Sequence, residues 1–171
     1  MDEHERTRIR AAIDAAEGGG APPPSDEQLR ALLAESRTIA IVGASPKADR
    51  PSHGVLLALK AAGWSILPVN PAANALADGV AGLTCFPDLA TAAASLPSGE
   101  RIDLVDIFRR SEDCAAVTRE AIAVGAGAIW LQLGIISPEA AALAADAGVS
   151  FVQDRCTAIE AQRLKVTGSS A

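Results

Sequence analysis

Five short apolar runs recur along the chain, and small, polar or basic residues follow each of them at once. The runs span residues 38–42, 64–69, 102–107, 128–131 and 149–152. Segments with helical spacing of apolar residues or helix-start signals separate them, near residues 52–62, 88–95, 111–124, 137–147 and 157–165. Alternating strands and helices are typical of a parallel sheet covered by helices on both faces. We therefore expect an α/β fold with a doubly wound, mainly parallel sheet of about five to six strands.

Two further helices are predicted before the first strand. Apolar residues recur at helical spacing within residues 5–17, and a run rich in Gly and Pro ends that helix. Ser25 and Gln28 then have the spacing of a capping box, which predicts a helix that ends near Glu35. The expected organisation is an N-terminal helix and Gly/Pro-rich linker at 1–24, a folded domain at 25–166 and a disordered tail at 167–171.

Composition changes this picture mainly by excluding classes of function. The length of 171 residues suits one domain, and the three cysteines argue against a disulfide framework. The formal net charge of −6 disfavours nucleic acid as a partner, because a phosphate backbone demands a basic face. The charged start predicts no secretory signal, and no apolar stretch is long enough to span a membrane. We expect a soluble, cytoplasmic protein.

The residues after the predicted strands would lie side by side, because open α/β sheets gather the carboxyl ends of their strands at one ligand-binding edge. The first strand leads into Gly43, Ala44, Ser45 and Lys47, and Arg50 follows at the start of a helix. Such a small-residue loop lets backbone N–H groups approach phosphate oxygens, and the helix N-terminus adds positive potential. A phosphate-bearing ligand is one interpretation, and a turn glycine with two solvated cations is the other.

Two adjacent arginines follow the third predicted strand. At least one of Arg109 and Arg110 should point along the sheet edge toward a ligand. The other could pair with Asp106 or Asp154. This expectation depends on the burial of the strand, which makes accidental surface charges at its end improbable.

The remaining strand ends carry polar residues without charge. Asn70 and Pro71 would form a rigid corner beside the first loop, although a plain turn explains them equally. Gln132 and Gly134 would offer their backbone to a linear ligand. Cys156 is either a reactive thiol at a helix N-terminus or, as we prefer, a packed structural cysteine.

Several patterns of catalysis and nucleotide binding are missing from the sequence. The first loop has no G-x-G-x-x-G, and the second strand ends in Asn70 instead of the acidic residue that holds a nicotinamide cofactor's ribose. No P-loop, no metal-ligand spacing of His and Cys and no nucleophile elbow occurs. We therefore expect binding without a metal ion and without catalysis.

Taken together, the strand-end motifs closely resemble those of stand-alone CoA-binding domain proteins, a family similar to the nucleotide-binding domain of the succinyl-CoA synthetase α subunit. The motifs lie at 43–47, 49–52, 68–71, 106–110, 130–134 and 154–156, within a match over about residues 26–165. The resemblance implies a Rossmann-like sheet that binds coenzyme A or acyl-CoA along its strand ends. It implies these neighbours for the ligand: Gly43, Ala44, Ser45 and Lys47 with Arg50 at the pyrophosphate, Val69, Asn70 and Pro71 at the adenosine, Ile107, Phe108 and Arg109 in the middle, and Gln132 and Gly134 toward the pantetheine.

The chain departs from the family at one position. Ala158 stands where the family commonly has a lysine, two residues after the cysteine, so any role of that lysine does not carry over. The synthetase's second domain, with its phosphorylated histidine, has no counterpart here, and we do not expect a complete acyl-CoA ligase. The leading hypothesis is a non-catalytic CoA or acyl-CoA binding module. The alternatives are a subunit of an acyl-CoA ligase-like system that needs a protein partner, and a Rossmann domain for another nucleotide such as NAD(P). The sequence leaves both a protein partner and a homo-oligomer open.

Overall fold

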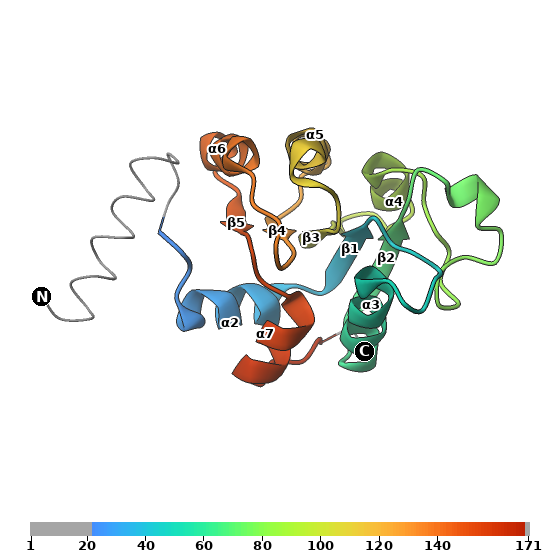
Figure 1. Ribbon diagram of the computed structural model, residues 1–171, viewed down its shortest axis with the longest axis horizontal. Helices are drawn as coiled ribbons and strands as arrows, with labels where there is room; N and C mark the ends of the chain where they lie inside the picture. Colours follow the sequence, from blue (N-terminus) through green and yellow to red (C-terminus); the bar gives the residue numbers. More distant parts are fainter. Residues whose placement is uncertain (1–21, 170–171) are drawn as a thin grey trace, which may run out of the picture.

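A five-stranded parallel sheet forms the centre of the computed structural model, which describes residues 22–169 (Figure 1). The expected helix at 5–17 lies outside the described residues. The strands are β1 (Thr38–Val42), β2 (Ser65–Val69), β3 (Leu104–Ile107), β4 (Ala128–Leu131) and β5 (Ser150–Val152). They lie in the order β2-β1-β3-β4-β5, and each neighbouring pair is parallel. The predicted doubly wound α/β fold is confirmed.

Helices cover both faces of this sheet, as Figure 1 shows. One face carries α2 (Asp26–Glu35), α3 (Pro51–Ala61) and α7 (Thr157–Leu164). The other carries α4 (Leu89–Ala94), α5 (Ser111–Ala123) and α6 (Pro138–Ala147). A short 3₁₀ helix, η1 (Ala73–Ala75), follows β2. None of the helices within residues 22–169 is long and apolar enough to cross a membrane.

Local signals in the sequence place the helix starts. The predicted capping box is present, because the Ser25 hydroxyl accepts from Gln28 N at 3.2 Å and Gln28 Oε1 accepts from Ser25 N at 2.9 Å. Ser137 caps α6 by accepting from Ala140 N at 3.1 Å, with Pro138 in the first turn. These caps satisfy backbone N–H groups that would otherwise lack partners. They fix where each helix begins after a strand-end loop.

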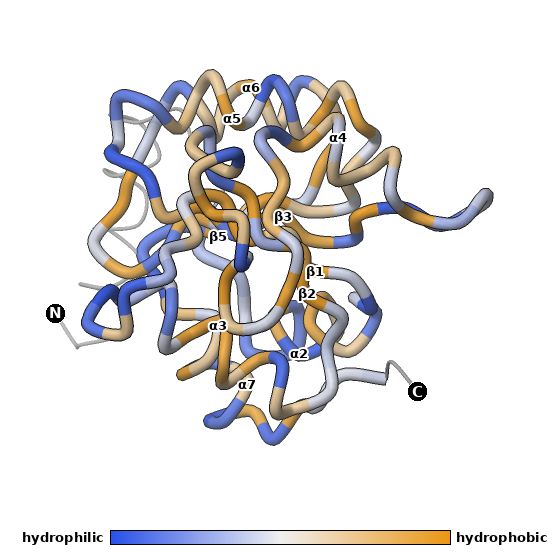
Figure 2. The backbone as a smooth tube through the Cα atoms, turned by 90° about the vertical axis from the view of Figure 1, so that its right-hand side faces the viewer, coloured by the Kyte–Doolittle hydropathy of each residue, from blue (hydrophilic) through white to orange (hydrophobic). Residues whose placement is uncertain are grey.

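The core is divided into two layers by the pleat of the sheet, because successive side chains of a strand point to opposite faces. In β1, Ile39 and Ile41 pack into the layer under α2, α3 and α7, whereas Ala40 and Val42 pack into the layer under α4, α5 and α6. In Figure 2, where the backbone is coloured by hydropathy, the hydrophobic segments include the strands at the centre of the molecule. Covered on both faces, the central strands read as continuous apolar runs. Asp106 of β3 breaks this pattern and is fully buried.

The amino end of the sheet is closed by Asp103, which the sequence analysis assigned to a strand. The third strand begins one residue later, at Leu104. The Asp103 carboxylate accepts from Arg37 N at 2.8 Å and from Thr38 N at 3.0 Å, and its backbone N donates to Thr38 O at 3.0 Å. These bonds tie the start of β1 to the start of β3, at the end opposite the predicted ligand edge.

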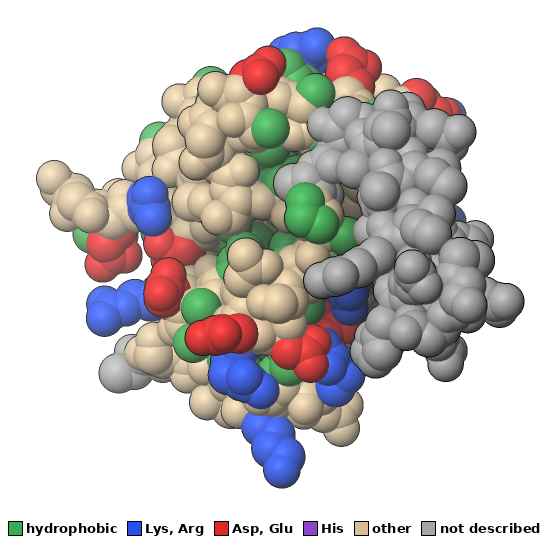
Figure 3. Space-filling model, turned by 90° about the vertical axis from the view of Figure 1, so that its left-hand side faces the viewer, with side chains coloured by type: hydrophobic (Ala, Val, Ile, Leu, Met, Phe, Trp, Pro, Cys, Tyr) green, Lys and Arg blue, Asp and Glu red, His purple; other side chains and the backbone are tan. Residues whose placement is uncertain are grey.

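Ion pairs hold α7 against α2. The guanidinium of Arg163 lies 2.7 Å from Asp26 and 2.6 Å from Glu160. Arg155 lies 3.4 Å from the same Glu160. Figure 3 shows acidic and basic side chains close together on this part of the surface. Beyond α7, Gly168 N donates to Ala62 O at 2.9 Å, so the chain returns to the end of α3.

Candidate functional site

The topology places a switch point between β1 and β3. From β1 the chain crosses to β2 on one side and then returns past β1 to β3 on the other side. The loops after β1 and β3 therefore lead to helices on opposite faces of the sheet, α3 and α5, which is the arrangement that defines a switch point (Figure 1). Open α/β sheets with the order 2-1-3-4-5 bind their ligands at this point.

Gly43 is the residue that lets three strand ends meet. Its φ of +89° is a conformation that L side chains rarely adopt, and a Cβ at this position would lie 2.5 Å from Phe108 O. Gly43 N and Ala44 N both donate to Val69 O, at 2.9 and 3.2 Å. Phe108 N donates to Val42 O at 2.8 Å. The loop after β1 is thus bound to β2 and lies directly against the backbone after β3.

These bonds change the expected role of the first loop. The resemblance implies that Gly43 and Ala44 surround a pyrophosphate, yet both of their N–H groups already donate to Val69 O. Lys47 N donates to the Ser45 hydroxyl at 3.2 Å, and His53 Nδ1 lies 2.9 Å from Ser45 O. The loop is therefore held in place from within, and its cationic side chains are the stronger candidates for contact with phosphate.

Asn70 forms the expected corner beside this loop. Its Nδ2 donates to Ala44 O at 2.8 Å, and its Oδ1 accepts from Ala72 N at 2.9 Å. Its backbone N donates to Phe86 O at 2.9 Å. The Nδ2 and backbone N–H of Asn70 thus link its loop to two other segments, and its Oδ1 closes a turn within its own loop. Pro71 next to it is exposed.

Lys47 and Arg50 supply the unpaired positive charge of the edge. Both side chains are exposed, and neither forms an ion pair with any residue in 22–169. Arg50 also precedes the first residue of α3, which has Pro51 in its first turn and no side-chain cap. An anion placed here would meet two free cations and the positive end of a helix dipole.

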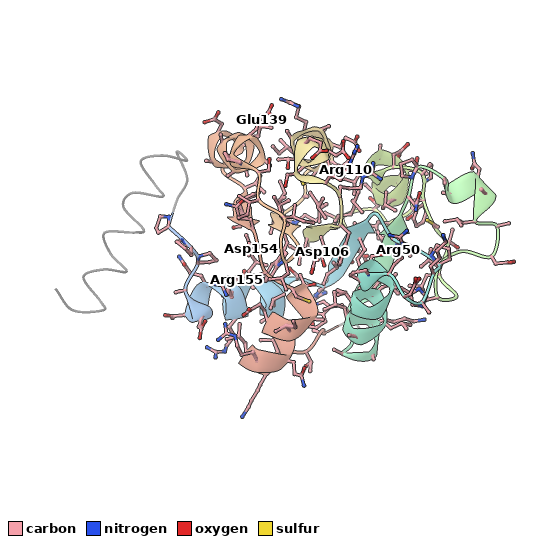
Figure 4. The ribbon with its side chains drawn as sticks, viewed as in Figure 1. Arg50, Asp106, Arg110, Glu139, Asp154 and Arg155 are labelled. Carbon is pink, nitrogen blue, oxygen red and sulfur yellow. The ribbon has the colours of Figure 1, made fainter. Side chains whose placement is uncertain are left out.

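The two arginines after β3 are arranged differently from the expectation. Arg110 lies 3.3 Å from Asp113 and 3.5 Å from Glu112, and Arg109 lies 3.7 Å from Asp113. The expected pairing of one arginine with Asp106 or Asp154 is wrong. The acidic residues in the first turn of α5 follow the two arginines directly in the sequence, whereas Asp106 faces the opposite layer of the core. Figure 4 shows Arg110 beside α5. Arg109 keeps 38% of its side chain exposed and has one long ion pair, so it remains able to face a ligand.

A buried polar cluster lies beneath the carboxyl edge. Gln132 Nε2 donates to Asp106 Oδ1 at 2.8 Å and to Oδ2 at 3.0 Å. Thr157 Oγ1 donates to Asp106 Oδ2 at 2.7 Å and accepts from Gln132 Nε2 at 2.8 Å. Burial raises the pKa of the Asp106 carboxyl to about 7, against the opposite effect of its two hydrogen-bonding partners. The cluster joins the ends of β3 and β4 to the start of α7.

The sequence analysis did not identify this cluster as part of the site, although one signal was present. Asp106 lies inside an apolar run that the alternation of strands and helices places at the centre of the sheet. A carboxyl group there must find buried hydrogen-bond partners. The partners, Gln132 and Thr157, are 26 and 51 residues away, so only the fold reveals them.

The loop after β4 is fixed from the loop after β5. Gly134 N donates to Asp154 Oδ1 at 2.7 Å, and Asp154 N donates to Ile135 O at 3.2 Å. Leu133 and Ile136, on either side of these contacts, are 63% and 50% exposed. The loop therefore offers apolar side chains beside the strand ends; Cys156, just before α7, is half-buried.

The structure thus brings the predicted site residues to one edge of the sheet, in two ways. The side chains of Ser45, Lys47, Arg50, Pro71 and Arg109 are exposed or half-exposed, and Gly134 is exposed. The remaining predicted residues offer mainly backbone or buried groups: Gly43, Ala44, Val69, Asn70, Ile107, Phe108 and Gln132. Whether these residues contact a ligand stays a prediction.

Two hollows lie away from this edge. One, of about 460 Å³, lies at the amino end of the sheet near Arg101, Asp103 and Phe151. The other, of about 320 Å³, lies beside η1. Neither is lined by a predicted site residue. Within residues 22–169, no group of three or more His, Cys, Asp and Glu side chains is placed to hold a metal ion. The candidate site is therefore defined by the strand ends.

Comparison with known proteins identifies the class to which this fold and edge belong. Residues 37–162 match the family model described as a CoA binding domain, so the chain belongs to the CoA binding domain family.

Particular relatives agree with this membership. Over 133 residues the chain is 33% identical to the uncharacterized protein YneT of Bacillus subtilis (strain 168), covering 78% of this chain and 91% of that protein. The solved structure of cell-free ID.343 from Thermus thermophilus is 34% identical, with a TM-score of 0.72 over 82% of this chain and 99% of the other. A dinucleotide-forming acetyl-coenzyme A synthetase 1 of Ca. Korarchaeum cryptofilum, solved with phosphate and ADP, shares the fold. That last likeness has 22% identity and a TM-score of 0.56, over 72% of this chain and 26% of the synthetase.

Proposed function

We propose that this protein binds coenzyme A or an acyl-CoA along the carboxyl edge of its sheet, as a module without catalytic activity of its own. The observation that carries the proposal is the switch point between β1 and β3 in a member of the CoA binding domain family, where Lys47 and Arg50 form no ion pair with the residues that the structure describes. Open sheets of this order bind their ligands at the switch point.

The charges of the edge suit this ligand. Coenzyme A carries a pyrophosphate and a 3′-phosphate, joined to an uncharged pantetheine arm with two amides and a terminal thiol. Lys47, Arg50 and the half-exposed Arg109 concentrate positive charge on one edge of a chain whose formal net charge is −6. A local cluster of this kind attracts an anion even when the whole protein is acidic. Leu133 and Ile136 offer apolar contact to the arm or to an acyl group.

The test is calorimetric titration of the purified, ligand-stripped protein with CoA, with NAD titrated in parallel. Binding of CoA at micromolar or lower Kd, without binding of NAD, supports the proposal. Binding of NAD instead would favour a domain for another nucleotide, and an absence of heat with CoA would refute the proposal. A series of acyl-CoAs then shows whether an acyl group adds affinity.

A second candidate is a subunit of an acyl-CoA ligase-like system. The shared fold with the acetyl-coenzyme A synthetase of Ca. Korarchaeum cryptofilum favours it, because the likeness covers only 26% of that synthetase. In this case the chain would supply the CoA site and a partner would supply the catalytic groups. Co-purification of this chain with a larger protein, with turnover only when both are present, distinguishes the two candidates.

The free cation of Lys47 gives the proposal a mutational test. Lys47→Ala should weaken CoA binding by about 1.5–3 kcal/mol, the range for a lost hydrogen bond to a charged group. The matched control is Lys60→Ala, since Lys60 lies in the last turn of the helix that Arg50 precedes and its Nζ donates to Ala81 O at 3.4 Å. Titration of both variants with CoA and with dephospho-CoA shows which phosphate Lys47 contacts. Equal affinity of the two variants would contradict the assignment of Lys47 to the site.

A further inference from the structure

We propose that Asp106 is a positioning residue of the CoA site: its carboxylate holds the side-chain amide of Gln132 so that Gln132 Oε1 faces the ligand edge as a hydrogen-bond acceptor. The acceptor suits an amide N–H of the pantetheine arm, because this arm is the part of CoA that carries N–H donors outside the adenine. The inference rests on the proposed function and names a further contact of the same site.

The orientation of the Gln132 amide follows from its partners. An ionised carboxylate can only accept hydrogen bonds, so the NH₂ group of Gln132 must face Asp106. It lies 2.8 and 3.0 Å from the two oxygens of Asp106 and 2.8 Å from Thr157 Oγ1. The carbonyl oxygen Oε1 consequently points away from the carboxylate.

Solvent reaches that oxygen, although Gln132 as a whole is only 4% exposed. Within residues 22–169, Thr118 Oγ1 is the single buried side-chain oxygen or nitrogen that has no hydrogen-bond partner. Gln132 Oε1 accepts no hydrogen bond from these residues either, so it would share the status of Thr118 Oγ1 if it were buried. It does not share that status. It must therefore be open to solvent, and Gln132 directly follows β4 at the carboxyl edge. Gln132 Oε1 is therefore an acceptor that has no donor among residues 22–169, at the edge of the sheet where we expect the ligand.

A proton on Oδ1 of Asp106 would reverse this arrangement, because Gln132 is the one hydrogen-bond partner of Oδ1 within residues 22–169, whereas Oδ2 already accepts from the Thr157 hydroxyl. The protonated carboxyl becomes a donor, and the neighbouring amide can accept from it only by turning Oε1 inward. The NH₂ group of Gln132 would then face the edge, and the acceptor would be lost. The protonation state of one buried group thus sets whether the site presents an acceptor or a donor.

No charged side chain sets the proton affinity of Asp106, which depends mainly on burial and on its bonds to Gln132 and Thr157. The neighbouring strands β1 and β4 carry no titratable side chain. The helices that cover this face of the sheet carry several charged or titratable side chains, none of which is among the causes of the pKa shift: Asp26, Glu27, Arg30 and Glu35 in α2, His53 and Lys60 in α3, and Glu160 and Arg163 in α7. Glu160 is paired with Arg155 at 3.4 Å, and Cys114 packs in the opposite core layer.

The test is the pH profile of CoA affinity between about pH 5.5 and 8.5, for the wild type and for Asp106→Asn. With the carboxyl titrating near a pKa of about 7, about 3% of the protein is in the competent state at pH 5.5, so affinity should fall by up to about 30-fold. Asp106→Asn has no such proton to gain, and its profile should show only the titration of CoA's own phosphate, whose pKa is about 6. Asp103→Asn is the matched control, because Asp103 holds the opposite end of the sheet and should leave the profile unchanged.

A second variant guards against a folding defect in Asp106→Asn. Thr157→Val removes a hydrogen bond that lowers the pKa of Asp106, so the loss of affinity should begin at a higher pH. A wild-type profile equal to that of Asp106→Asn, or a Thr157→Val midpoint that does not rise, would overturn the inference.

The outcome separates the two proposals. Tight CoA binding that does not depend on Asp106 would refute the inference and leave the proposed function intact. No CoA binding at any pH would refute the proposed function. In the ligand-free protein, NMR then decides the first part of the inference alone, because the side-chain amide signals of Gln132 should shift with the same midpoint as the Asp106 carboxyl. An amide that does not follow the carboxyl would overturn it.

Discussion

Replacing Gly43 by alanine should lower the free energy of unfolding by about 2–5 kcal/mol, the sum of about 1–2 kcal/mol for a non-glycine residue at positive φ and about 1–3 kcal/mol for overpacking. The new Cβ would lie 2.5 Å from Phe108 O, and both groups belong to backbone that is bonded to its neighbours. Neither loop can yield without breaking a bond: Gly43 N donates to Val69 O, and Phe108 N donates to Val42 O.

The same substitution should reduce CoA affinity at least about tenfold, equivalent to about 1.4 kcal/mol. Moving the first loop away from Phe108 would displace Lys47 and the start of α3, which Ser45 O and His53 hold together at 2.9 Å. Affinity and stability should therefore fall together in Gly43→Ala.

Chemical denaturation and calorimetry measure these two effects, with Gly125→Ala as the control. Gly125 has a similar φ of +75°, but a Cβ there would meet nothing within 4 Å, and the residue lies after α5, away from the edge. The control should carry the conformational penalty of about 1–2 kcal/mol without the clash and without loss of affinity. Equal destabilisation by both substitutions would show that the contact with Phe108 O is unimportant.

The fold could be predicted because its signals are local. Strands covered on both faces must be apolar at every position, as β1 is, and such runs are visible without a structure. The helix starts were equally visible, since Ser25 and Ser137 cap residues three positions away. The strand boundary at Asp103 was missed because its carboxylate pairs with the backbone of Arg37 and Thr38, 66 and 65 residues away.

The site could be predicted only in outline, for the same reason. Topology alone brings the strand ends to one edge, so the position of the candidate site followed from the sequence. The sequence did not reveal that Gly43 N and Ala44 N already donate to Val69 O, or that Arg110 pairs with Asp113. The bonds of Asp106 to Gln132 also join distant segments. Each of these contacts depends on how loops pack across the sheet, which spacing within one loop does not determine.

Asp106 should make the protein less stable as the pH rises, and Asp106→Asn should remove that dependence. The folded-state pKa of Asp106 is about 7, against an ordinary value of 3.8. Between these values the folded protein binds a proton that the unfolded chain releases, so the free energy of unfolding falls as the pH rises. The stability is fully present below about pH 4 and is lost as the pH passes through about 7.

The expected size follows from the size of the shift. About three pKa units correspond to about 4 kcal/mol at pH 8, because each unit is about 1.4 kcal/mol. Asparagine has no charge to bury, so Asp106→Asn should be more stable than the wild type at pH 8, by a difference that shrinks toward pH 5. Urea denaturation at pH 5, 6.5 and 8 measures this difference. Asp103→Asn, which changes a carboxylate outside the buried cluster, should show no such trend.

A difference that is the same at pH 5 and pH 8 would mean that Asp106 is ionised throughout this range in the folded protein, as it is in the unfolded chain. That result would also show that no proton on Asp106 controls the acceptor at Gln132. If instead the difference grows with pH, Asp106 destabilises the fold most in its ionised form, the form that holds Gln132 Oε1 toward the edge. The ionised state of this buried carboxylate, which has no cationic partner among its hydrogen bonds, would then be both the less stable state and the state that prepares the proposed site for its ligand. Such a trade-off is expected when function rather than folding requires the group.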